Sequence, residues 1–395
     1  LFHSGLDHSA YLTQLSVELE GPLNTAAMQQ AWNQVVSRHD VFRTAFSDDH
    51  SHQIVLSKVD LPFAIMDWSE MAEPELQQRF ARFLSEDREQ GFDFKQVPLM
   101  RVALIALSDQ RHRLVWTNHH ALSDGWSLPL VLKDVMFFYK EACSDSTAQA
   151  IDDVPVSTLP EVQAYEHYID WLQAQDVEKA KSYWKDSLLG IETPTDINVG
   201  SIKGDSAAEA QKQSLALSAE QSSGLQSLAK QHKVTLNTLV QAAWAYLLSC
   251  YNDEEQVIYG ETIAGRPAEI SGVEDMVGLF INSLPVPVKI DFKQGIGDWL
   301  RAMHQASIDR AEHGFVSLAD IQNLSEMSAN GESERRLFNT LLVFENYPID
   351  QELERVVAGS GLSVKDIRNE EQTNYALTLM VLPESAGLDL SLIHI

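Results

Sequence analysis

The first third of the chain alternates between short apolar, β-branched runs and segments whose apolar residues recur every three or four positions. The runs predict strands and the longer period predicts helices. Strands are expected at about 14–19, 53–56, 99–106 and 111–118, and helices at 26–38, 74–90 and 127–142. Asn24 is placed to cap the helix at 26–38. This order predicts an α/β fold with a mixed sheet covered by helices.

The second part repeats this organisation after a stretch at 144–159 that is rich in Ser, Thr, Asp and Pro and reads as a linker. Residues 200–210 are small and polar, and we expect a mobile surface loop there. The expected helices are 160–175, 176–189, one from 218 and 235–251, and the expected strands are 212–217, 256–260, 284–290, 337–344 and 374–382. A chain of 395 residues exceeds the usual size of one core. We therefore expect two lobes, 1–159 and 160–395.

Composition narrows the classes of function. No apolar run approaches the roughly 20 residues needed to span a bilayer, and the N-terminus lacks a secretory pattern. Cys143 and Cys250 are the only cysteines, too few for a disulfide framework. A formal charge of −28 argues against nucleic acid or an anionic membrane as the main partner. These features predict a cytoplasmic protein without a membrane span.

The stretch from Asn118 to Ser127 carries the strongest chemical signal, because paired histidines stand four residues before an Asp-Gly turn. The preceding strand delivers His119 and His120 to its end, and adjacent strand side chains point to opposite faces. One imidazole can therefore face a cavity as a base while the other packs behind it. Gly125 supplies the backbone freedom for a sharp turn. Asp124 is expected to be a buried carboxylate that orients the loop.

Other chemistries have little support. No G-x-S-x-G elbow is present, and Ser123 and Ser127 lie where they can brace the loop backbone. No phosphate-binding glycine loop appears. No glutamate stands at the spacing of zinc proteases, so we expect no metal site.

The histidine stretch resembles the HHxxxDG motif of the condensation domains of nonribosomal peptide synthetases, and more loosely the HxxxD motif of chloramphenicol acetyltransferase. Further segments resemble that family's motifs in the family's order. They are Arg38–Phe46, with Asp40 and Phe42 replacing the usual Glu and Leu, then Tyr165–Trp171, Val277–Pro285 and Leu342–Pro348.

The resemblance implies a fold of two chloramphenicol-acetyltransferase-like lobes in a V-shaped pseudo-dimer, with the motif at the floor of a tunnel. It implies catalytic roles for His120 and Gly125, and orienting roles for His119, Asp124 and Arg43, with a buried salt bridge between the last two. The residues that it suggests for the tunnel lining are Trp126, Ser127 and Asn282.

It further implies peptide-bond formation between thioesters on the phosphopantetheine arms of donor and acceptor peptidyl carrier domains. The domain itself would bind no cofactor. It would act as a monomer within a larger synthetase, beside an adenylation domain.

Segments at 1–4, 126–130, 278–282 and 344–348 look most like the subtype that accepts a donor ending in a D-residue. Open alternatives are an epimerisation domain, an ester-forming relative, a free-standing enzyme that uses coenzyme A esters, and a catalytically silent recruitment domain. Glu312–Val316 matches the epimerisation signature poorly, and heterocyclisation domains carry Asp in place of both histidines. The chain opens inside the family's first motif, so we expect its true start upstream. Residues 390–395 break the family pattern, and we interpret them as non-native.

Overall fold

The computed structural model describes residues 11–47, 52–144, 159–196, 211–325, 336–345, 349–371, 375–383 and 387–394. The chain forms two compact units. Unit 1 comprises 1–170, 267–280 and 347–373, and unit 2 comprises 171–266, 281–346 and 374–395. Two segments from the second half of the chain therefore belong to unit 1, which a division at residue 159 alone does not include. The division into two contiguous lobes stays a prediction.

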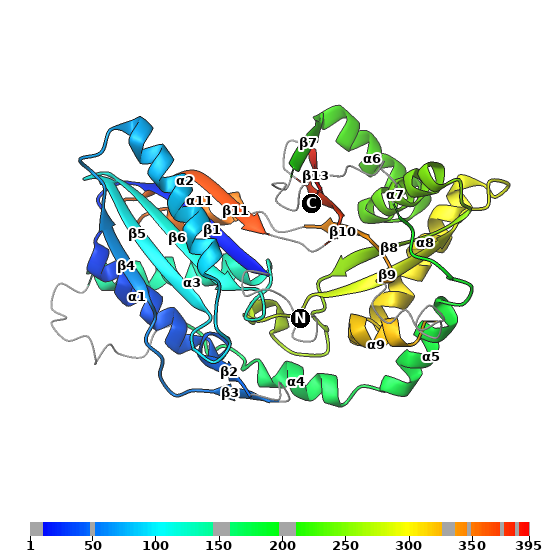
Figure 1. Cartoon of the computed structure of the whole chain (residues 1–395), viewed down its shortest axis with the longest axis horizontal. Helices are drawn as coiled ribbons and strands as arrows, with labels where there is room; N and C mark the ends of the chain where they lie inside the picture. Colours follow the sequence, from blue (N-terminus) through cyan, green and yellow to red (C-terminus); the bar gives the residue numbers. More distant parts are fainter. Residues whose placement is uncertain are drawn as a thin grey trace. The chain divides into compact units, whose positions relative to one another are not determined.

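Unit 1 is built on a five-stranded sheet in the order β11-β1-β6-β5-β4 (Figure 1). Only β4 and β5 run parallel to each other. The strands are β1 (Leu12–Glu20), β4 (Phe63–Asp67), β5 (Met100–Ser108), β6 (Arg111–His119) and β11 (Ser363–Glu371). A separate hairpin pairs β2 (Thr44–Phe46) with β3 (Gln53–Val55).

Helices cover both faces of this sheet because β5 and β6 carry apolar side chains on both sides. One face packs on α1 (Thr25–Arg38), α3 (Ser127–Ser144) and α11 (Ile349–Val357), around Trp32 and Trp116. The other face packs on α2 (Glu73–Gln90) through Phe80 and Leu84. β6 lies between β1 and β5, so it is held on both edges.

Unit 2 contains a six-stranded sheet in the order β7-β13-β12-β10-β8-β9. These strands are β7 (Gln211–Leu217), β8 (Gln256–Ile263), β9 (Asn282–Lys289), β10 (Thr340–Phe344), β12 (Leu377–Pro383) and β13 (Leu388–His394). One core contains residues of α6 (Ala219–His232), α7 (Leu236–Asn252) and α8 (Ile296–Glu312). A second core contains residues of α5 (Val177–Ser187) and α9 (Leu318–Asn323).

The strand and helix predictions for the first third of the chain are confirmed, with ends shifted by a few residues. Asn24 accepts the Ala27 N–H at 3.1 Å, as a capping residue does. In the remainder, the helix expected at 160–175 is α4 and spans only Glu166–Gln173. The pattern missed β2, β4, β11, β13, α8, α9 and α11. The loop expected at 200–210, and most of the linker expected at 144–159, lie outside the described residues.

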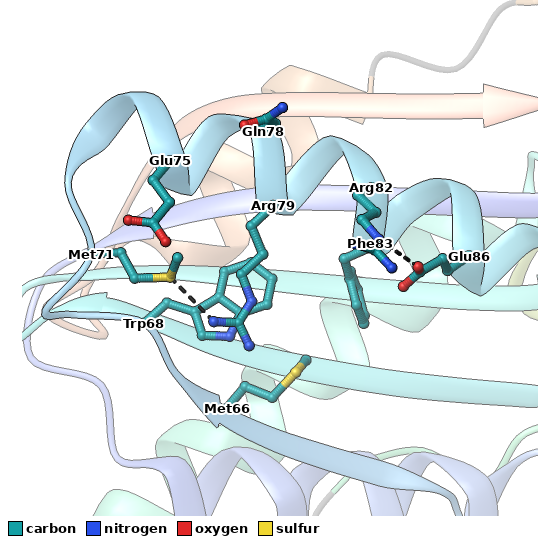
Figure 2. A pocket seen from close by; sticks show the side chains of 9 residues that line it. All are labelled: Met66, Trp68, Met71, Glu75, Gln78, Arg79, Arg82, Phe83 and Glu86. Carbon is teal, nitrogen blue, oxygen red and sulfur yellow. Dashed lines mark hydrogen bonds and ion pairs between the residues drawn. The ribbon is translucent and has the colours of Figure 1, made fainter.

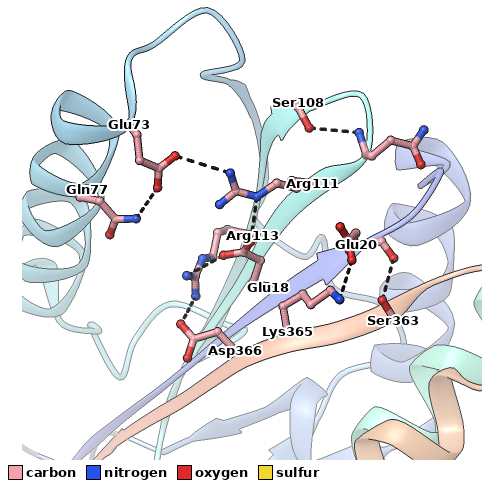
Figure 3. Close-up of polar contacts among 11 residues, drawn as sticks. Glu18, Glu20, Glu73, Gln77, Ser108, Arg111, Arg113, Ser363, Lys365 and Asp366 are labelled. Carbon is pink, nitrogen blue, oxygen red and sulfur yellow. Dashed lines mark hydrogen bonds and ion pairs between the residues drawn. The ribbon is translucent and has the colours of Figure 1, made fainter.

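Ion pairs tie the late strand β11 to the sheet of unit 1 (Figure 3). The buried Arg113 guanidinium lies 2.8 Å from a Glu18 carboxylate oxygen and 2.9 Å from Asp366 on β11. Arg111 binds the other oxygen of Glu18 at 2.9 Å. β11 is rich in charged residues, so apolar alternation could not identify it. Antiparallel pairing with β1 and these ion pairs hold β11 in the sheet.

No helix in the described ranges is long and apolar enough to cross a membrane.

Candidate active site

The end of β6 places the two histidines, because its neighbours hold the backbone of both. The His119 N–H donates to the Leu99 carbonyl at 2.9 Å, and the His120 N–H donates to the Tyr11 carbonyl at 2.8 Å. β6 ends at His119, and residues 120–122 form a turn before α3 begins at Ser127. The histidine pair is therefore anchored on both sides at the point where the strand stops.

The two imidazoles lie in different surroundings. His119 is buried, its Nδ1 accepts the Ala121 N–H at 3.0 Å, and its ring lies edge-on to Phe94 with centroids 4.7 Å apart. A nitrogen that accepts an N–H carries no proton, so the neutral His119 ring holds its hydrogen on Nε2. His120 is half-buried, and its imidazole forms no hydrogen bond with any described residue. This contrast leaves His120 as the histidine whose ring nitrogens are available for proton transfer.

Asp124 is buried and binds two separate segments of unit 1. Its Oδ1 accepts the Ser127 N–H at 3.0 Å and lies 2.9 Å from Ser127 Oγ. Its Oδ2 accepts the Phe280 N–H at 3.0 Å. Ser127 Oγ also accepts the Gly278 N–H at 3.1 Å, and the Asp124 N–H donates to the Gly278 carbonyl at 3.1 Å. We call Asp124, Ser127, Gly278 and Phe280 the loop cluster.

The predicted salt bridge between Asp124 and Arg43 is wrong. The Arg43 guanidinium donates instead to the Asp40 carboxylate and to the carbonyls of Val36 and Leu56. Asp40 and Arg43 are the two ends of a four-residue 3-10 helix, in which positions three apart lie on the same side. The nearby carboxylate therefore captures Arg43, and Asp124 is held by donors of the loop cluster.

The three residues suggested for the tunnel lining differ in position. Ser127 is fully buried, and its hydroxyl is engaged in the loop cluster. Asn282 begins β9 in unit 2, where its amide donates to the carbonyls of Gly314 and Val316 at 2.8 and 2.7 Å. Trp126 is half-buried in the turn before α3. The tunnel itself stays a prediction.

Gly125 lies in the same turn, and its carbonyl accepts the Leu128 N–H at 3.2 Å. A cavity of about 20 Å³ lies beside Gly125 and is lined in part by Trp116, Asn118 and Ser123. That volume is enough for about one water molecule.

Asn118, which connects the strand to the loop, is not among the predicted site residues. Its side-chain oxygen accepts the Thr13 hydroxyl at 2.7 Å, and its NH₂ donates to Ser123 Oγ at 3.2 Å. A polar residue immediately before the histidine pair was the signal available. Asn118 thereby braces the turn that carries His120.

Two aromatic residues from the Tyr165–Trp171 segment complete the support of the loop cluster. The Tyr165 hydroxyl donates to the Leu279 carbonyl, and the rings of Tyr165 and Tyr168 lie 5.3 and 4.7 Å from the Phe280 ring. A Cβ on Gly278 would lie 2.3 Å from the Tyr165 ring, so only glycine fits there. Three segments far apart in the sequence thus meet at the turn after the histidines.

The described residues include no group of three or more His, Cys, Asp or Glu side chains placed to hold a metal ion.

A family model for the condensation domain matches residues 1–394. This chain belongs to the condensation domain family. Over 391 residues this condensation domain is 37% identical to a subunit of the linear gramicidin synthase of Brevibacillus parabrevis, covering 97% of the chain and 5% of that protein. It is 31% identical over 400 residues to bacitracin synthase 1 of Bacillus licheniformis, covering 99% of the chain and 7% of that protein. The chain thus spans a small part of the length of these relatives.

Its fold is similar to a mutant of the starter condensation domain of rhizomide synthetase, solved in complex with C8-CoA. The TM-score is 0.76 at 19% identity, over 98% of this chain and 84% of the other. The predicted condensation-domain fold, an α/β arrangement with mixed sheets, is confirmed. The V-shaped arrangement of its lobes stays a prediction.

Proposed function

We propose that this condensation domain joins an aminoacyl or peptidyl donor to the α-amine of an aminoacyl acceptor. Both substrates would be thioesters on the phosphopantetheine arms of carrier domains, supplied by a larger synthetase that includes an adenylation domain. This proposal is supported by membership of the condensation domain family and by sequence similarity to the gramicidin and bacitracin synthases.

The observation that carries the proposal is the contrast between the paired histidines. His119 is buried and bonded, whereas the His120 imidazole is half-buried and forms no hydrogen bond with a described residue. A general base must be within hydrogen-bond reach of the proton it takes, and His120 has both ring nitrogens available for that contact. The position of His120 directly after the end of β6 therefore supports a role in proton transfer.

In the proposed reaction the acceptor amine attacks the donor thioester carbonyl. The C–N bond forms, the C–S bond breaks, and the proton of the amine passes to the departing thiolate, directly or through His120. His120 either takes this proton or stabilises the zwitterionic tetrahedral intermediate. In this proposal, backbone N–H groups of the loop at Gly125 stabilise the developing oxyanion.

Much of the rate enhancement should come from positioning. A correctly oriented pair of reactants reaches effective molarities on the order of 10⁵ M or more. Such precision requires a turn that does not move, and the loop cluster joins both ends of the Asp124–Ser127 turn to residues 278–280. Asp124 and Ser127 therefore act as positioning residues in this proposal.

The test is peptide formation between a loaded donor carrier and a loaded acceptor carrier, measured by mass spectrometry. His120→Ala should lower the rate by roughly 10² to 10⁴, the usual contribution of a general acid–base group. His167→Ala, which removes an exposed histidine of α4, is the matched control and should leave the rate unchanged.

Each alternative predicts a different product. An ester-forming domain would react faster with a hydroxyacyl acceptor than with an aminoacyl acceptor. An epimerisation domain would invert a single carrier-bound residue without an acceptor. A folded wild-type domain that gives no product with any of these substrates would be a recruitment domain, and the proposal would fail.

A further inference from the structure

A groove of about 550 Å³ lies outside the candidate active site, between β4 and α2 (Figure 2). Figure 2 shows Met66 and Trp68 between β4 and the overlying helix, with Phe83 and Arg79 reaching down from α2. The walls are therefore sulfur and aromatic groups, which adapt well to apolar ligands. The exposed rim is polar and consists of Glu75, Gln78, Arg79, Arg82 and Glu86.

The groove opens beside the edge of the sheet of unit 1. β4 is the last strand in the described sheet and pairs only with β5. The Pro62 carbonyl and the Trp68 N–H both form hydrogen bonds with β5. The backbone N–H and carbonyl groups of the even-numbered residues between them therefore point toward β5. Phe63, Ile65 and Asp67 therefore direct their N–H and carbonyl groups away from the sheet. The Ile65 side chain is 54% exposed, and neither proline nor lysine interrupts this strand to discourage pairing.

Arg79 adds a charge that lacks an acidic partner among the described residues. Its guanidinium stacks over the Trp68 ring at 4.5 Å, and one N–H contacts the Met71 sulfur at 3.3 Å. The neighbouring Arg82 is paired with Glu86 at 2.6 Å. The chain has 57 acidic and 29 basic residues, yet no carboxylate of the described residues forms an ion pair with Arg79. Its planar fork of N–H groups is suited to a carboxylate from another molecule.

We propose that the β4 edge and this groove bind an extended segment of a partner protein that presents an acidic side chain two positions away from an apolar one. The segment adds as a sixth strand, and its backbone bonds to the outward groups of Phe63, Ile65 and Asp67. Alternate side chains of an added strand point to the same face. One apolar side chain fills the space between Met66 and Phe83, and the acidic side chain two positions away reaches Arg79.

The probe is a fluorescein-labelled seven-residue peptide with threonine at odd positions and leucine, glutamate and leucine at even positions. Fluorescence anisotropy with the full 395-residue chain should show saturable binding with a Kd below about 1 mM. Arg79→Glu should weaken binding at least about tenfold, and so should a peptide with lysine in place of glutamate. Arg301→Glu, a surface arginine of α8 in unit 2, is the matched control and should not change the Kd.

Backbone pairing is tested on the peptide, which leaves the protein intact. N-methylation of one alternate set of peptide amides should abolish binding, and N-methylation of the other set should preserve it, because only one set faces β4. If Arg79→Glu fails to fold, Arg79→Gln removes the charge with less disturbance. No binding up to about 1 mM, equal effects of the two methylated sets, or tighter binding of a helical peptide of the same composition would overturn the proposal.

Discussion

Truncation of Asp124 to alanine removes the acceptor that joins the turn after the histidines to residue 280. The buried Phe280 N–H bonds to Asp124 Oδ2 at 3.0 Å and would be left without an acceptor. The Ser127 N–H would keep its hydrogen bond to the Asp124 backbone carbonyl at 3.0 Å, and Ser127 Oγ would keep its hydrogen bond from the Gly278 N–H. One orphaned buried donor costs about 1–3 kcal/mol.

The Phe280 amide therefore provides a local reporter. In Asp124→Ala, hydrogen exchange at residues 278–280 should accelerate about 5- to 150-fold, which corresponds to that loss of about 1–3 kcal/mol. Asp124→Asn should have a smaller effect, because the amide oxygen can still accept from Phe280 while its NH₂ donates to Ser127 Oγ. Asp298→Ala, which removes an exposed carboxylate of α8, is the control.

Exchange is measured by mass spectrometry on peptides that span these residues, so the result does not depend on cooperative unfolding of the two units. Unchanged exchange in Asp124→Ala would refute the claim that the carboxylate holds residue 280. Equal acceleration in Asp124→Asn and Asp124→Ala would show that the charge, rather than the acceptor geometry, is responsible.

Three further predictions concern pH, the β11 ion pairs and stereochemistry. Burial lowers the pKa of His112 below its ordinary 6.5. As pH falls through 6.5, the unfolded chain therefore binds the proton first, and the free energy of unfolding decreases by at most about 1.4 kcal/mol per pH unit. This pH dependence, measured by urea unfolding, should disappear in His112→Leu. Burial opposes ionisation of Asp366, but the hydrogen bond and charge of Arg113 outweigh it and hold the pKa of Asp366 below its usual value. That pair therefore stabilises the fold above about pH 4, and this stabilisation is lost on further acidification. Arg113→Met should lower the free energy of unfolding, measured with urea, by about 3 kcal/mol and should weaken its dependence on pH below about 4. An unchanged dependence on acidic pH would contradict this. A donor ending in a D-residue should condense at least about ten times faster than its L-epimer when each is loaded on the same carrier protein and the acceptor is held constant. Equal rates would exclude that subtype.

Most of the local structure could be predicted from the sequence, because apolar periodicity and capping residues act over one or two turns or strands. The sequence also placed the paired histidines at a strand end, where β6 ends at His119. The ordered motifs were sufficient to indicate the condensation domain family, since each is a contiguous run that can be compared directly.

Which of those motifs meet could not be predicted, because it depends on how the chain packs. The hydrogen bonds of Asp124 and Ser127 to residues 278–280 join positions about 150 apart in sequence, and no local pattern specifies such a contact. The family resemblance implies a salt bridge between Arg43 and Asp124, but the 3-10 helix brings Asp40 closer to Arg43. The polar strand β11 enters unit 1 through its pairing with β1 and the ion pair of Arg113. In each case the outcome depends on which donors and charges lie nearest after packing, and that distance is a property of the folded chain.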